Sequence, residues 1–248
     1  MISRDLDRPD RALAIASHPD DIEFGCGATL AKWSAAGCEV SHVVCTDGSK
    51  GTWDVDADVV ALVAVRQEEQ RAAARALGAT GEVVFLDRVD GELVDDRDTR
   101  SELARWIRVL RPDVVVGHDP WKRYRLHPDH RAAGFLTVDA VVAARDPHFF
   151  REHGVAHHRP QALLLFEADE PDHVEDVTGF VHAKVDALLA HQSQFETTMK
   201  IGPGQSVSAT VERDAFANRI EVELAEVAGW ANLPASRRAE RFKLITDL

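Results

Sequence analysis

The run Arg11-Ala-Leu-Ala-Ile-Ala16 and the polar segment Ser17-His-Pro-Asp-Asp21 directly after it indicate the fold of this chain. A short apolar run that is bounded by prolines is typical of a buried parallel strand. Residues 22–36 then have a helical pattern that ends at Gly37, the position of a helix C-cap. We therefore predict a strand, a polar loop and a helix in this order.

The alternation of strand and helix continues along the chain. Strands are expected at 11–16, 39–45, 82–86, 113–117 and 162–166, and helices at 22–36, 58–77, 99–110, 128–145, 179–193 and 212–229. Residues 241–245 are expected to form either a closing strand or a helix end. Because such alternation implies parallel pairing through right-handed crossovers, we predict a three-layer α/β/α, Rossmann-like fold with a mostly parallel sheet. We expect one domain over residues 1–248.

The composition excludes several classes of function. The 29 Lys and Arg against 42 Asp and Glu give a net charge of -13, and no basic run suits a phosphate backbone, so we expect no nucleic-acid partner. No apolar run approaches the roughly 18 residues of a membrane span, and the N-terminus has no signal-peptide pattern. We expect a cytoplasmic protein with reduced cysteines, because the 3 cysteines form no CxxC pair. The sequence leaves the oligomeric state open between a monomer and a homo-oligomer, and closed homo-oligomers are common.

Two segments rich in His and Asp follow predicted strands. His18-Pro-Asp-Asp21 follows the first strand, and His127-Pro-Asp-His130 closes the loop after the fourth. Either segment alone is equally typical of a helix start with an Asp cap and an early proline. Because ligands bind outside the carboxyl ends of parallel strands, finding both at that edge favours a functional site.

These residue types suit a catalytic zinc ion. Two histidines and one carboxylate, here His18, Asp21 and His130, leave a fourth coordination position for water. Pro128 suits the first position of a helix, which would make His127 its cap and would place His130 in the first turn. Asp20, next to Asp21, is then the candidate general base.

Two further polar side chains complete this hypothesis. His127 would stabilise an oxyanion or protonate a leaving amine. Asp129 would orient one of the imidazoles.

At this point the sequence resembles the PIG-L/LmbE-like zinc-dependent N-deacetylases. The resemblance covers about residues 11–195 and rests on the motifs Ser17-His-Pro-Asp-Asp-Ile-Glu-Phe-Gly-Cys-Gly-Ala-Thr-Leu30, Thr46-Asp-Gly48, Arg66-Gln-Glu-Glu69, His127-Pro-Asp-His130 and His191-Gln-Ser-Gln194. It implies zinc on His18, Asp21 and His130, Asp20 as base, His127 as electrostatic partner and Asp129 polarising His127. It also implies action on N-acetyl groups of glucosamine-containing small molecules.

Residues near these motifs are candidates for substrate binding, each with an ordinary alternative. Arg66 is either a surface arginine of the second long helix or, as the resemblance favours, a pocket residue. Trp53 stacks on a sugar ring or packs in the core, and Tyr124 is a lid or oxyanion residue or an ordinary loop residue. Gly25-Cys-Gly27 lacks the rest of a dinucleotide-binding fingerprint, so we reject that function.

We therefore predict a zinc-dependent hydrolase that removes the N-acetyl group from an N-acetylglucosamine-type sugar or sugar conjugate. One alternative is an amidase that cleaves a larger sugar–amino acid conjugate. The other is a metal- or sugar-binding protein without turnover.

Overall fold

The computed structural model describes residues 2–202 and 207–248, and its strands form one eight-stranded sheet. The strands are β1 (Ser3–Arg4), β2 (Arg11–Ala16), β3 (Glu39–Thr46), β4 (Val83–Arg88), β5 (Val114–His118), β6 (Ala162–Phe166), β7 (His173–Asp176) and β8 (Ala239–Ile245). Their order in the sheet is β1-β7-β8-β6-β5-β2-β3-β4. Only β8 runs antiparallel to its neighbours, β6 and β7, so the predicted mostly parallel α/β sheet is confirmed.

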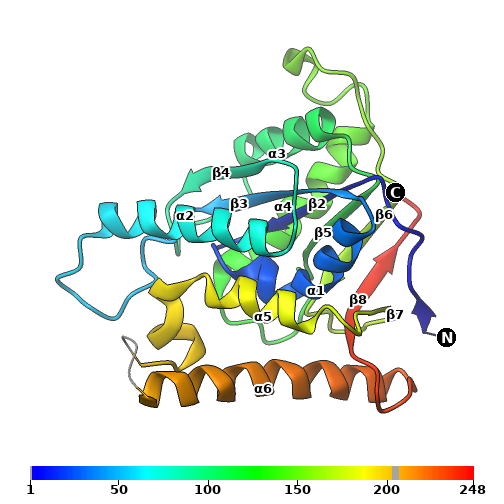
Figure 1. Cartoon of the computed structure of the whole chain (residues 1–248). Coiled ribbons are helices and arrows are strands. Elements are labelled where there is room, and N and C mark those ends of the chain that lie inside the picture. Colours follow the sequence, from blue (N-terminus) through cyan, green and yellow to red (C-terminus); the bar gives the residue numbers. More distant parts are fainter. Residues whose placement is uncertain (1, 203–206) are drawn as a thin grey trace.

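Helices cover both faces of this sheet (Figure 1). The helices are α1 (Asp21–Ala35), α2 (Val59–Ala76), α3 (Arg97–Leu110), α4 (Pro128–Arg145), α5 (Val181–Leu189) and α6 (Val207–Trp230), with short turns of 3₁₀ or π helix at η1 (Arg151–His153), η2 (Gln192–Gln194) and η3 (Phe195–Met199). Helices α1, α2 and α5 pack on one face, and α3 and α4 pack on the other. Helix α6 lies outside, against α5 and β8 (Figure 1).

The first long strand shows how the sequence directs this layering. Successive side chains of a strand point to opposite faces. In β2 the small Ala12, Ala14 and Ala16 face the layer of α1, while Leu13 and Ile15 face α3 and α4. The small side chains let α1 pack closely on the sheet, and the short turn 17–20 joins the end of β2 to the start of α1.

Helix α1 is interrupted near its start. A Cβ on Gly25 would lie 2.6 Å from the ring of Phe166, and Cys26 has a non-helical φ of -149°. The helix resumes with its free N–H groups capped, since Glu240 accepts hydrogen bonds from the backbone of Ala28 (3.1 Å) and Thr29 (2.8 Å). Gly25 therefore allows close packing of α1 on β6.

The expected elements agree with the structure along most of the chain, with two short strands unanticipated. Residues 241–245 belong to the closing strand β8 and do not end a helix. Strands β1 and β7 were not predicted, because β7 is short and carries His173 and Glu175, which are buried and pair with each other at 2.9 Å. Among the described residues no helix is long and apolar enough to cross a membrane.

The two motif-bearing loops leave neighbouring strands at one edge of the sheet. Strand β2 pairs with β3 on one side and with β5 on the other, so the strand order reverses there. Such a reversal is the topological switch point at which open α/β sheets bind ligands.

Candidate active site

The carboxylate of Asp21 points back toward the turn between β2 and α1. Its Oδ2 accepts hydrogen bonds from the hydroxyl of Ser17 (2.6 Å) and from the backbone N–H of His18 (2.8 Å). Asp20 occupies the N-cap position of α1 in a left-handed conformation (φ 99°) but makes no side-chain cap hydrogen bond. The carboxylate of Asp20 therefore remains available to the cleft that it lines.

Two residues on one face of α2 hold this turn in place. Arg66 donates hydrogen bonds to the carbonyl oxygens of Pro19 (2.7 Å) and Gly48 (2.8 Å), and Gln70 Oε1 accepts one from the N–H of Asp20 (3.1 Å). Arg66 is only 3% exposed, and its Nη2 lies 3.8 Å from Asp20 Oδ2. The guanidinium thus acts chiefly on the backbone of the turn in this structure, although it also lines the cleft.

The start of α4 brings the second motif to the same place. Helix α4 begins at Pro128, with His127 at the N-cap and His130 in the first turn. The ring centroid of His18 lies 4.6 Å from that of His127 and 5.2 Å from that of His130. Segments more than one hundred residues apart thus present three imidazoles to one point.

Three groups in the described part of the chain place possible metal-ligand atoms within 4.8 Å of one another. These groups are His18, Asp21 and His130; His18, His127 and Asp129; and His118, His130 and Glu167. In the first group Asp21 Oδ2 is 3.1 Å from His18 Nδ1, and Asp21 Oδ1 is 3.4 Å from His130 Nε2. All three members of that group are among the residues that line cavities at the site.

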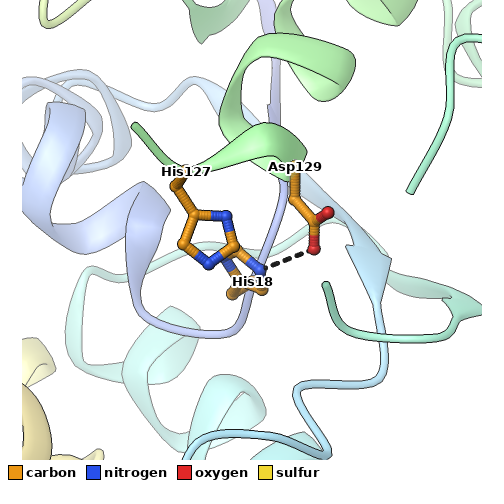
Figure 2. A group of neighbouring side chains, drawn as sticks. All are labelled: His18, His127 and Asp129. Atoms are coloured by element: carbon orange, nitrogen blue, oxygen red, sulfur yellow. Dashed lines mark hydrogen bonds and ion pairs between the residues drawn. The ribbon is translucent and has the colours of Figure 1, made fainter. Parts of the chain in front are cut away.

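Asp129 pairs with His18 in the second group, as Figure 2 shows. Its Oδ2 is 3.0 Å from His18 Nε2, and its carboxylate accepts hydrogen bonds from the N–H groups of Gly91 (2.6 Å) and Leu93 (3.2 Å). Asp129 is fully buried. In this structure its carboxylate thus orients His18, whereas the family resemblance associates it with His127.

Burial and charge shift the ionisation of the motif residues in opposite directions. Burial raises the pKa of Asp20 to about 6. Burial also opposes ionisation of Asp21, but His130, His118 and His18 together hold its pKa well below the ordinary value. Although burial favours neutral imidazole, contacts with Asp129, Asp21 and Asp90 raise the pKa of His18. The site is therefore rich in negative charge and favours a cation.

The cleft in front of these residues holds about 370 Å³. Trp53 lines it and is 76% exposed, so its indole face is accessible rather than packed in the core. Thr197 and Thr198 also line it. Tyr124 is 94% exposed and lies outside the described lining of this cleft.

Three residues at the site were not anticipated from the sequence. Asp90, after β4, places its Oδ1 3.1 Å from His18 Nε2. His118 ends β5, with its Nε2 3.4 Å from Asp21 Oδ2, and Glu167 follows β6. All three lie at the ends of parallel strands, so the rule that located the two motifs also indicates these positions.

Comparison with known proteins identifies the family to which this chain belongs. The family model described as PIG-L, GlcNAc-PI de-N-acetylase, matches residues 13–141. The chain belongs to the PIG-L family. The match includes both His/Asp motifs, and the family recognised from those motifs is therefore confirmed.

Two relatives of the chain are deacetylases of amino-sugar compounds. The chain is 37% identical to the diacetylchitobiose deacetylase of Thermococcus kodakarensis, over 75% of this chain and 70% of that enzyme. It is 34% identical to the 1D-myo-inositol 2-acetamido-2-deoxy-alpha-D-glucopyranoside deacetylase of Kineococcus radiotolerans, over 56% of this chain but only 46% of that enzyme.

A solved structure of the family shares the whole architecture. The N,N'-diacetylchitobiose deacetylase of Pyrococcus horikoshii, in complex with an inhibitor, matches with a TM-score of 0.81 and 30% identity. The match covers 96% of this chain and 84% of the Pyrococcus chain.

Proposed function

We propose that this protein is a zinc-dependent N-deacetylase that removes the acetyl group from an N-acetylglucosamine-type sugar or sugar conjugate. The observation that carries the proposal is the convergence of His18, Asp21 and His130 beside the buried carboxylate of Asp20. The deacetylase activities named for the Thermococcus and Kineococcus relatives support it.

The donor atoms in the first group fit a catalytic zinc ion. Two imidazole nitrogens and one carboxylate are the protein ligands that such sites use, with a coordination position left open. His18, Asp21 and His130 would hold the ion, whereas the fully buried Asp129 is committed to backbone N–H groups. When bound, zinc polarises a carbonyl group and lowers the pKa of water.

Asp20 is proposed as the general base that takes the proton of the attacking water and passes it toward the leaving amine. Its carboxylate lines the cleft, and α2 holds its backbone through Gln70. Burial raises its pKa to about 6, which brings the group near the range in which proton transfer in both directions is efficient.

His127 lines the same cleft as this base. Its ring contacts that of His18 edge-on. We propose that it donates a hydrogen bond to the oxyanion that develops on the amide carbonyl. Asp129 would steady His18 through the hydrogen bond that Figure 2 shows, and its expected action on His127 stays a prediction.

The walls of the cleft support a sugar substrate. The exposed indole of Trp53 offers a flat apolar face for a pyranose ring. The hydroxyl groups of Thr52, Thr197 and Thr198 can exchange hydrogen bonds with sugar hydroxyls.

We also propose that residues 1–248 act as one domain in the cytoplasm. The three cysteines support the reducing compartment, because they are free and buried.

A panel of N-acetylglucosaminides, scored for both acetate and free amine, tests this function. We expect equal amounts of the two products, loss of turnover with a chelator and recovery with added zinc. His130→Ala should lower the zinc content, whereas replacement of the exposed His148 should leave it unchanged.

The products also separate the alternatives. Amine without acetate would indicate cleavage of a larger amide. Binding of the sugars without any turnover in the zinc-loaded protein would contradict the enzyme proposal and favour a binding protein.

A further inference from the structure

A second cluster of possible metal ligands lies on the side of His130 that faces away from Asp21. His118 ends β5, and Glu167 directly follows β6, the adjacent parallel strand. His118, His130 and Glu167 place ligand atoms within 4.8 Å of one another. His130 presents Nε2 to Asp21 (3.4 Å) and Nδ1 to Glu167 Oε2 (3.9 Å), so its two ring nitrogens address two separate groups.

His118 is the buried member of this cluster and has an unused nitrogen. It is 2% exposed, and its Nε2 lies 3.1 Å from the hydroxyl of Ser17. Its Nδ1 has no hydrogen-bond partner among the described residues, although Glu167 Oε2 is 3.5 Å away. A buried polar atom without a partner is costly, and a cation bound between this nitrogen and the carboxylate would use it.

A side chain of the protein itself already places a positive charge at the cluster. Arg125 Nη1 and Nη2 lie 2.8 and 2.7 Å from the two carboxylate oxygens of Glu167, and Nη2 also contacts His130 Nδ1. The guanidinium therefore meets the same carboxylate and the same imidazole that a metal ion would use. Arg125 belongs to the loop between β5 and α4, so its side chain can withdraw without unfolding a helix or strand.

His118 and Glu167 line a cavity of about 450 Å³, which shares Asp21 and Phe24 with the 370 Å³ cleft described above. Five carboxylate residues line this cavity, against three basic residues: Asp21, Glu167, Glu223, Glu226 and Glu240, against Lys122, Lys184 and Arg241. Lys184 is paired with Glu240 at 2.6 Å. The excess of negative charge concentrates cations next to His118.

We propose that His118, Glu167 and the Nδ1 of His130 form a second divalent-cation site, for which the Arg125 guanidinium competes. Imidazole and carboxylate ligands suit zinc and similar transition-metal ions. Because Arg125 must be displaced, zinc binds here more weakly than at the first centre. The inference rests on the proposed metal centre only through the shared His130.

Titration of the metal-free full chain with zinc alone tests this site. The wild-type protein should bind one ion tightly and a second more weakly. Arg125→Gln should tighten the second step about tenfold, since it removes the charge-assisted pair that competes with the ion. Glu167→Gln, which keeps the side-chain shape, should abolish the second step and retain the first.

A matched control comes from the same loop. Arg123 is exposed and pairs with Asp169 at 2.6 Å, so Arg123→Gln removes the same charge away from the cluster and should leave both steps unchanged. Circular dichroism checks that each variant is folded.

The outcomes separate this inference from the proposed function. A single bound ion in Arg125→Gln at millimolar zinc would overturn the second site. A second ion that is insensitive to both Arg125→Gln and Glu167→Gln would also overturn it, because that ion binds elsewhere. If the wild-type protein showed no tight step but did show a weak step that Glu167→Gln abolishes, the result would contradict the proposed catalytic centre and support the second site.

Discussion

The two halves of the candidate site are held very differently. The turn after β2 is buried and tied down, with His18 7% and Asp20 6% exposed and with Arg66 and Gln70 bonded to its backbone. The approach to α4 is an open loop, in which Tyr124 is 94% exposed. One half is a rigid platform, and the other carries its histidines on a helix start behind a solvent-exposed loop.

This difference suggests that the buried turn positions the catalytic base and that the exposed loop contacts the substrate. Chemistry that depends on a proton acceptor needs a base held within a fraction of an ångström, and a buried, clamped turn supplies it. A loop that fits varied sugar conjugates benefits from exposure instead. Substitutions in the buried turn should therefore affect turnover, whereas those in the exposed loop should affect substrate affinity.

Asp20→Asn should have the largest effect, because it removes the proposed proton acceptor from the rigid half. We expect turnover to fall by about 10²–10⁴-fold with the zinc content unchanged. Steady-state kinetics and metal analysis of the same sample measure both. Asp56→Asn, the same change in an exposed loop, is the control. Wild-type turnover in the Asp20 variant would remove Asp20 from the mechanism.

Arg66→Leu should have an intermediate effect, since it releases the clamp without touching the acetyl group. We expect turnover to fall about tenfold, corresponding to about 1.4 kcal/mol, and the protein to lose about 1–3 kcal/mol of stability as buried carbonyl oxygens lose their donor. Denaturant unfolding and kinetics test this.

The pattern of kinetic constants distinguishes a clamp from a substrate ligand. A rise in KM at unchanged kcat and unchanged stability would show that Arg66 instead binds the sugar. Arg75→Leu, on the exposed part of the same helix, should change stability by less than about 0.5 kcal/mol.

Tyr124→Ala should have the smallest effect, because this side chain is almost fully exposed. We expect stability within about 0.5 kcal/mol of wild type, and a change in KM that exceeds any change in kcat. Kinetics with a short and a long sugar conjugate measure it. A large loss of kcat that is also seen in Tyr124→Phe would mean that the hydroxyl reaches the reacting carbonyl and that this half of the site closes.

Several elements could be predicted because their signal is local. The apolar run of β2 and the helix start at Pro128 are present in a few adjacent residues, and both lie where expected. Strand β7 could not be recognised in this way, since the polar His173 and Glu175 are buried only in the folded protein, where they pair with each other and Glu175 also pairs with Lys32 of α1. His118 follows a predicted strand, but only the structure shows that it lies beside Asp21 and Glu167 and is a possible metal ligand.

The sequence by itself determined the α/β order, the edge of the sheet that carries the site and the residue types of the two motifs, because strand periodicity and motif chemistry are encoded over short stretches. Only the tertiary structure decided which partners these residues have. It pairs Asp129 with His18, turns Arg66 toward the backbone of the first motif and sets Glu167 beside His130. These contacts join segments far apart in the chain, and their geometry depends on how the strands and helices pack.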